Sequence, residues 1–165
     1  MGRISYYEMI PYMSPAYMAA DEHHHQVAFF EILKKQFPQL REVSFAIPNG
    51  GSRNKVEAVN LKLEGVTPGM LDVMVAWPVY PSHGLFLEFK NMKRDAKPSP
   101  EQIQKLSVLR TAGYIALVVH GVEQALEALE MYLTSGMMPL NKTRTGIDYP
   151  AQVNGKYSHE YWLVS

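Results

Sequence analysis

The sequence predicts an α/β domain in which helices flank the faces of a mixed central sheet. The order of patterns along the chain is helix, strand, helix, strand, strand, helix, strand, helix. A length of 165 residues suits one domain, and a hydrophobic fraction of 47% is enough to form a buried core. We therefore expect a single domain over residues 1–165, with an arm (1–19), a core (20–134) and a C-terminal extension (135–165).

The helices are predicted from apolar side chains that recur every three or four residues. The first covers residues 21–37, with Asp21 as its N-cap. Its expected buried stripe consists of Val27, Phe30, Leu33 and Phe37. Another helix follows Ser99, a good N-cap, and Pro100, which suits the first helical position because it needs no N–H there. The complete set of expected helices covers residues 21–37, 54–64, 101–112 and 122–133.

The strands are predicted from short runs of β-favouring side chains at residues 43–47, 71–76, 85–90 and 114–119. The last run is apolar throughout, which is typical of a strand buried on both faces of a sheet. In contrast, we expect residues 1–19 to form an irregular arm, because Pro11 and Pro15 disfavour a long helix. This arm would pack on the core or on a second subunit.

Composition narrows the chemistry that the chain can perform. There are no cysteines, so disulfides and thiol nucleophiles are excluded, and any metal must be bound by oxygen or histidine ligands. No export signal is recognisable, which makes the cytoplasm the expected compartment. No run approaches the roughly 20 apolar residues that a membrane-spanning helix requires.

The net charge is zero, whereas nucleic-acid-binding proteins usually carry a basic excess. One segment, residues 90–110, nevertheless holds six basic side chains against two acidic ones. This segment is either an ordinary solvated surface or a basic lip beside an acidic site. The six basic residues are Lys90, Lys93, Arg94, Lys97, Lys105 and Arg110.

Three residues on neighbouring strands could act together on a phosphate. Asp72 and Glu88 offer the hard oxygen ligands that Mg²⁺ prefers. Alternation along the strand places Lys90 on the same face as Glu88, about 7 Å away, where an ammonium group can stabilise a phosphate. The spacing by itself also fits an exposed Glu-x-Lys ion pair, so it does not decide between these readings.

Six separated blocks make a more specific pattern. They run through Glu22-x-x-x-Gln26, Ile47-Pro48-Asn49-Gly50-Gly51-Ser52-Arg53, Glu64-Gly65-Val66-Thr67-Pro68-Gly69-x-x-Asp72, Gly84-Leu85-Phe86-Leu87-Glu88-Phe89-Lys90, Ser99-Pro100-Glu101-Gln102 and Ala112-Gly113-Tyr114. With these blocks the stretch from Glu22 to Leu133 resembles the VRR-NUC (virus-type replication-repair nuclease) family of PD-(D/E)xK phosphodiesterases. Leu71 is a departure, since the family usually has proline before the aspartate.

The resemblance implies a restriction-endonuclease-like core and a DNA endonuclease that depends on Mg²⁺ or Mn²⁺. It assigns the metal to Asp72 and Glu88, catalysis to Lys90, and completion of the metal site to the helix-borne acid Glu22. Gln102 would be a polar helper in catalysis. The substrate-binding positions implied near the DNA are Asn49, Gly51, Ser52 and Arg53.

Simpler readings exist for several of these residues. Glu22 could be a first-turn acid favoured by the helix dipole, and Gln102 could be a helix N-terminal residue without a task. The run His23-His24-His25 is expected at the surface, because three consecutive helical residues point in different directions and cannot chelate one ion together. His83, His120 and His159 lie in no motif that we identify.

The resemblance also implies a homodimer acting on branched DNA such as four-way junctions, in the manner of phage or bacterial resolvases that serve DNA repair and replication. Two other hypotheses stay open from the sequence. The chain could be a DNA-binding module that kept this fold and lost catalysis. It could also be a structural α/β domain in which the charges of Glu88 and Lys90 are incidental.

Overall fold

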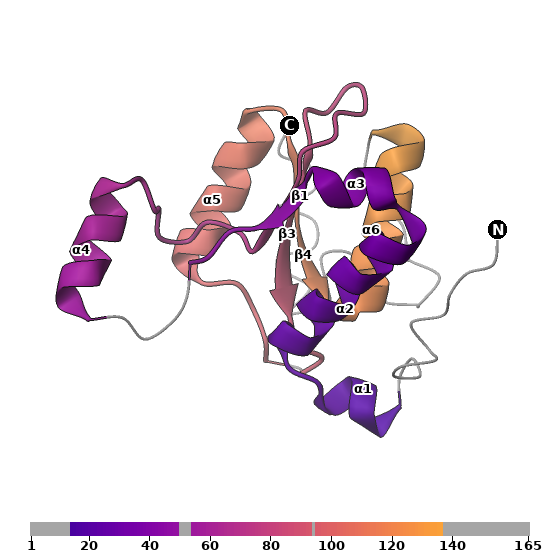
Figure 1. The fold of residues 1–165 in the computed structure, drawn as a ribbon, viewed down its shortest axis with the longest axis horizontal. Helices are drawn as coiled ribbons and strands as arrows, with labels where there is room; N and C mark the ends of the chain where they lie inside the picture. The colour runs from indigo at the N-terminus through magenta and orange to yellow at the C-terminus, as the bar shows by residue number, and fades with distance from the viewer. Residues whose placement is uncertain (1–13, 50–53, 94, 137–165) are drawn as a thin grey trace.

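The computed structural model describes residues 14–49, 54–93 and 95–136. The predicted order of elements is confirmed, with two additional short helices (Figure 1). In chain order the elements are α1 (Pro15–Ala19), α2 (Glu22–Gln36), α3 (Pro38–Glu42), β1 (Ser44–Ala46), α4 (Lys55–Leu63), β2 (Val73–Val75), β3 (Leu85–Lys90), α5 (Pro100–Thr111), β4 (Ile115–His120) and α6 (Gly121–Ser135).

The sheet of the described residues is mixed, as predicted, with the strand order β1-β2-β3-β4. The β1–β2 and β2–β3 pairs are antiparallel, while β3 and β4 are parallel. A parallel pair needs a crossover, and α5 provides it between these two strands. The β3–β4 register runs from Leu85 opposite Ile115 to Lys90 opposite His120, so both strands end together.

Helices cover both faces of this sheet, α2 and α6 on one side and α5 on the other (Figure 1). Alternation along β4 sends Leu117 and Val119 into the core under α2 and α6, and Ala116 and Val118 into the core under α5. The strand is therefore buried on both faces, which confirms the prediction from its apolar run. Leu71, which precedes Asp72, is fully buried in the core on the α5 side.

The predicted buried stripe of α2 is partly wrong. Leu33 is fully buried, but Val27 is 48% exposed, and Phe30 and Phe37 are only partly buried. The face that packs against α6 and β3 consists of His25, Ala28, Phe29, Ile32 and Leu33. Two apolar stripes share the same helical spacing on α2, and the neighbouring elements select which one faces the core.

The N-terminal arm contributes one turn of helix to the described structure. Residues 1–13 lie outside the described residues, but α1 places Tyr17 in the core, where its ring meets that of His25 edge-on at a centroid distance of 4.9 Å. The expectation of a surface histidine run is wrong for His25, which is fully buried, and holds for His23 and His24.

These two buried residues complete the start of α6. The N-cap residue of α6, His120, makes no side-chain cap. Instead, the N–H of Val122 donates to Nδ1 of His25 at 3.3 Å, and the N–H of Glu123 donates to the Tyr17 hydroxyl at 3.2 Å. Because helix-terminal N–H groups need partners, a distant segment caps this helix.

The helix α4 projects from the rest of the fold (Figure 1). It has no buried residue, and Val56, Val59 and Leu63 are 72%, 57% and 82% exposed. In the part of the chain that the structure describes, no helix has the length and apolar character needed to cross a membrane.

Candidate active site

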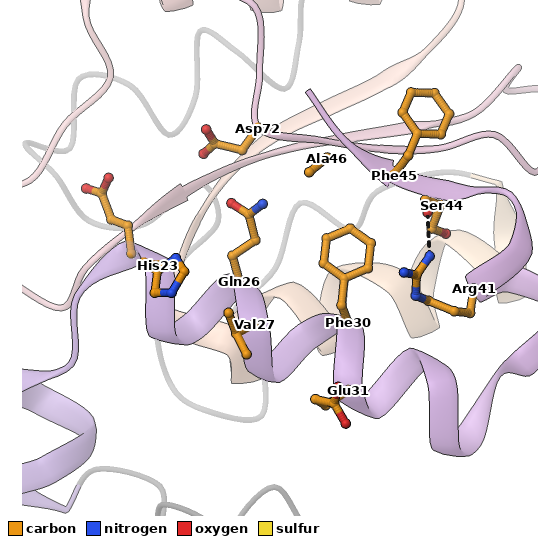
Figure 2. Close-up of a pocket in the computed structure, with 11 residues that line it drawn as sticks. His23, Gln26, Val27, Phe30, Glu31, Arg41, Ser44, Phe45, Ala46 and Asp72 are labelled. Atoms are coloured by element: carbon orange, nitrogen blue, oxygen red, sulfur yellow. Dashed lines mark hydrogen bonds between the residues drawn. The ribbon is translucent and has the colours of Figure 1, made fainter. Parts of the chain in front are cut away.

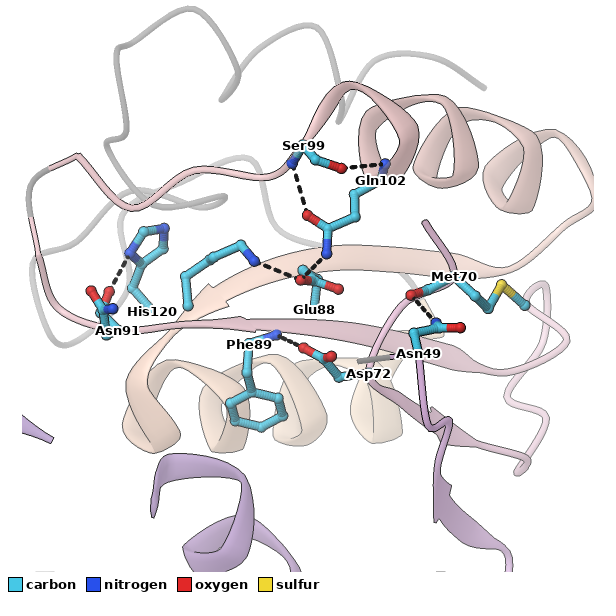
Figure 3. A network of polar contacts seen from close by, with 10 residues as sticks. Asn49, Met70, Asp72, Glu88, Phe89, Asn91, Ser99, Gln102 and His120 are labelled. Atoms are coloured by element: carbon cyan, nitrogen blue, oxygen red, sulfur yellow. Dashed lines mark hydrogen bonds and ion pairs between the residues drawn. The ribbon is translucent and has the colours of Figure 1, made fainter. Parts of the chain in front are cut away.

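The site forms where β2 and β3 separate (Figure 3). Pairing between these strands ends at Val73 opposite Leu87, and Asp72 stands just before it. Beyond this point the Asp72 side chain replaces the backbone of β2 as a hydrogen-bond partner of β3. Its Oδ2 accepts a hydrogen bond from the N–H of Phe89 at 2.8 Å. A buried N–H group needs such a partner. The contact fixes Asp72 beside the face of β3 that carries Glu88.

Glu88 is the most deeply buried acid of the site, with 1% of its surface exposed. Its Oε1 accepts hydrogen bonds from Nζ of Lys90, at 2.7 Å, and from Nε2 of Gln102 (Figure 3). Its Oε2 is buried and has no hydrogen-bond partner among the described residues. A buried carboxylate oxygen without a partner is costly, so this atom is suited to an external ligand.

Lys90 is not an exposed ion-pair residue. It is 9% exposed, and its ammonium group lies 2.7 Å from the Glu88 carboxylate. Burial lowers the pKa of Lys90, but the charges of Glu88, Glu22 and Asp72 and the hydrogen bond to Glu88 outweigh burial, so the pKa is raised. The lysine therefore keeps its positive charge inside the site.

The pKa values of Asp72 and Glu88 are both raised above their ordinary values. Burial raises the pKa of Glu88 to about 7, with a further contribution from the charge of Asp72, and the Lys90 ammonium opposes both. Burial also raises the pKa of Asp72, against the Phe89 hydrogen bond and the Lys90 charge. Two buried carboxyl groups side by side favour a proton or a cation between them.

Gln102 makes two kinds of contact at the start of α5. Its Oε1 accepts from the N–H of Ser99 at 2.8 Å, and its own N–H donates to the Ser99 hydroxyl at 3.2 Å, which completes a capping box at the start of α5. The other end of the amide, Nε2, donates to Glu88. One side chain therefore stabilises the helix start and joins it to the site.

Glu22 is the first residue of α2 and acts on the site through its charge. Its charge contributes to the raised pKa values of Glu88 and Lys90, and it lines a groove together with Asp72. This groove, which we call the α2–β1 groove, has a volume of about 620 Å³ and lies between α2 and β1 (Figure 2). It leads from Asp72 toward Arg41 along the helix.

The donor set fits a hard divalent cation. Asp72 and Glu88 offer carboxylate oxygens, and the free Oε2 of Glu88 is the atom that a cation would satisfy. Glu22 stands farther out, since no group of three or more acidic or histidine side chains is close enough to hold a metal among the described residues. The ion would thus be held by two carboxylates, with Glu22 adding negative charge.

The glycine-rich loop is described only at its edge. Nδ2 of Asn49 donates a hydrogen bond to the carbonyl of Met70, which ties the loop to the segment before Asp72. The other implied substrate-binding positions, Gly51, Ser52 and Arg53, lie outside the described residues.

The basic segment is smaller than its composition indicates. Lys90 belongs to the site itself, and the Arg110 guanidinium donates to the carbonyl of Ala116 at 2.7 and 3.0 Å. Arg94 lies outside the described residues. Lys93 and Lys97 are exposed and Lys105 is half-buried, and these three are the remaining cations of the segment within the described residues.

His120 is a neighbour of the site that the sequence did not reveal. It ends β4 directly opposite Lys90, and Nδ1 lies 2.9 Å from the carbonyl of Asn91. Since a carbonyl accepts, Nδ1 carries the proton, and Nε2 is a buried acceptor with no hydrogen-bond partner in the described ranges. Burial lowers the pKa of His120 to about 4, and the Lys90 charge lowers it further against the Asn91 contact. Only the strand register places His120 here.

Comparisons with known proteins bear on the fold. No family model matches the sequence, and no curated protein matches it. A solved structure described as a VRR_NUC domain protein superposes with a TM-score of 0.61 over 70% of this chain and 89% of that one, at 22% sequence identity. The two chains share a fold. At this identity the likeness concerns architecture, and the chemistry has to be argued from the side chains.

Proposed function

We propose that this protein is a divalent-metal-dependent DNA endonuclease. The observation that carries the proposal is the cluster of Asp72, Glu88 and Lys90 at the point where β2 and β3 separate. Asp72 precedes β2, whereas Glu88 and Lys90 both lie on β3, and the fold brings the three charged groups together under burial. The structural-domain hypothesis does not explain why a carboxylate oxygen and an ammonium group are kept inside.

The side chains divide the chemistry between them. Asp72 and Glu88 would hold the cation, Mg²⁺ or Mn²⁺, through their carboxylate oxygens. When bound there, it would lower the pKa of a water molecule and neutralise phosphoryl oxygens. The Lys90 ammonium faces the scissile phosphate and stabilises the negative charge that builds on it, and orients the attacking water. Gln102 holds Glu88 in place, so it is a positioning residue rather than a catalytic one.

The nature of the substrate forms a second part of the proposal. The exposed Lys93 and Lys97 follow Lys90 in sequence and provide the cationic contacts to the DNA backbone. We propose branched DNA, such as four-way junctions, as the substrate. A homodimer in the cytoplasm would act on it, because two-fold symmetry places two sites on two strands. The exposed apolar side chains of α4 provide an available surface for contacts between the two subunits.

The deciding experiment compares cleavage of a labelled four-way junction and a matched linear duplex in Mg²⁺ and in Mn²⁺. Lys90→Ala and Asp72→Asn should each abolish cutting, whereas Lys34→Ala, at an exposed position on α2, should cut like the wild type. Metal-dependent binding without cleavage by the wild type would favour the binding-module hypothesis instead. Equal cleavage of both DNAs, or a monomer in sedimentation, would refute the junction and dimer parts alone.

A further inference from the structure

The α2–β1 groove opens directly onto the candidate active site. Asp72 lines it at one end, and Ser44 and Ala46 of β1 form the wall opposite α2 (Figure 2). A ligand in the groove would therefore lie next to the reacting phosphate. The groove has a volume of about 620 Å³, which falls in the range of small-molecule pockets. It therefore suits one or two nucleotide units and not a length of duplex.

The lining of the groove mixes apolar and polar side chains. Gln26 and Phe30 project from α2 toward β1, one helical turn apart (Figure 2). The guanidinium of Arg41 lies over the Phe30 ring, 5.0 Å from its centroid, and donates to the Ser44 carbonyl at 3.1 Å. Val27, which is 48% exposed, adds apolar surface beside them. A planar ligand with polar edges matches this lining.

The charges of the groove argue against a phosphate as its occupant. Glu22, Glu31 and Asp72 contribute three carboxylates to the described lining, and Arg41 contributes one guanidinium. A polyanionic backbone threaded through the groove would meet net negative charge. An uncharged group attached to that backbone, such as a base, would not be repelled by this charge.

We propose that the α2–β1 groove binds an unpaired nucleobase of the nucleotide next to the scissile phosphodiester. The base stacks among Phe30, Val27 and the Arg41 plane, while Gln26 reaches its polar edge. The inference rests on the proposed nuclease function and refines it. Within the proposed class of branched DNA, the preferred substrates have unpaired nucleotides at the cut, such as the boundary between duplex and single strand. A four-way junction would expose such a base only by opening a base pair at its crossover.

The test uses two substitutions in the groove and one matched control. Ala46→Trp fills the groove from the exposed edge strand, where tryptophan is well tolerated. Phe30→Leu removes the ring but keeps apolar volume against the core. Ala76→Trp is the control, because Ala76 is exposed and does not line the groove. Far-UV circular dichroism confirms that each variant folds.

Binding is measured without cleavage, in Ca²⁺, with DNA that carries 2-aminopurine as the unpaired base at the junction of duplex and single strand. The fluorescence of this base responds to stacking. We expect a change with wild type and Ala76→Trp that Ala46→Trp abolishes and Phe30→Leu reduces. Affinity for this DNA should fall roughly five- to hundredfold in Ala46→Trp, the range for loss of one stacked base. Cleavage in Mg²⁺ should fall in parallel, and a fully paired duplex should be cut poorly by all.

The outcomes separate the two proposals. Normal cleavage with no fluorescence change, or with Ala46→Trp equal to Ala76→Trp, would overturn the base-binding groove and leave the nuclease. A groove-dependent fluorescence change without any metal-dependent cleavage would support the groove and refute the nuclease. Absence of both DNA binding and cleavage would overturn both.

Discussion

Two buried groups near the site should make the stability of the metal-free protein depend on pH in opposite directions. Burial lowers the pKa of His120 from 6.5 to about 4, and burial together with Asp72 raises the pKa of Glu88 from 4.5 to about 7. The folded state therefore binds a proton less tightly than the unfolded chain at His120, and more tightly at Glu88. Stability follows the difference in bound protons between the two states.

The sign differs for the two residues. The contribution of His120 is present above pH 6.5 and is lost as the pH falls toward 4. The contribution of Glu88 is present below pH 4.5 and is lost as the pH rises through 7. Since one pKa unit corresponds to roughly 1.4 kcal/mol, each contribution amounts to about 3 kcal/mol, and in the wild type they largely cancel between pH 4.5 and 6.5.

Substitution should reveal each contribution separately. In His120→Asn the new amide can still donate to the carbonyl of Asn91, but the group no longer titrates. As the pH rises from 4 to 6.5, the free energy of unfolding of the variant should therefore fall by about 3 kcal/mol relative to wild type. In Glu88→Gln the difference has the opposite sign. As the pH rises from 4.5 to 7, the free energy of unfolding of this variant should increase by about 3 kcal/mol relative to wild type.

The assay is urea unfolding followed by far-UV circular dichroism in EDTA at a series of pH values. Each variant is compared with wild type at every pH, so that constant losses of packing cancel. If both differences changed in the same direction, or if neither changed with pH, the assignment of a neutral His120 and a protonated Glu88 would be wrong.

Three further predictions follow from single contacts. Mg²⁺ affinity, measured by calorimetry, should fall as the pH is lowered through about 7, because the proton on Glu88 competes with the cation; an affinity that is constant from pH 8 to 6 would contradict this. Gln102→Ala should lower the free energy of unfolding by about 1 kcal/mol through loss of the capping box and should also reduce cleavage, whereas Gln104→Ala, at an exposed position on the same helix, should do neither. Tyr17→Phe should cost about 1 kcal/mol in urea unfolding, because the hydroxyl partner of the Glu123 N–H is lost at the start of α6; unchanged stability would show that this tertiary cap does not contribute.

Much of the fold follows from local signals. The run of β-favouring side chains from Leu85 to Lys90 predicted β3, and the Ser99-Pro100 pair marked the start of α5, because these signals depend on neighbours in sequence. The buried stripe of α2 was mispredicted at Val27 because such signals depend on neighbours in sequence alone. Sequence spacing identifies the apolar stripes of a helix, but α6 and β3 determine which stripe is buried.

The candidate site, like the fold, could be predicted only in part from the sequence. The types and spacing of Asp72, Glu88 and Lys90 are visible in the sequence, and so are the acid of Glu22 and the helix start at Gln102. Their protonation states are not, because desolvation depends on how many atoms surround each group once the chain is folded. His120 has no local motif and joins the site only through the parallel β3–β4 register.

The sequence by itself determined the class of fold and the order of its elements, since these depend on side-chain type and periodicity along the chain. The residues assigned to the chemistry came from the resemblance in six blocks and stay a prediction. Only the tertiary structure decided that one Glu88 oxygen has no hydrogen-bond partner among the described residues, that His25 and Tyr17 cap α6, and that a groove runs from Asp72 along α2. Each of these depends on contacts between segments far apart in sequence. Burial and the pairing of polar groups arise from such contacts, which no local pattern encodes.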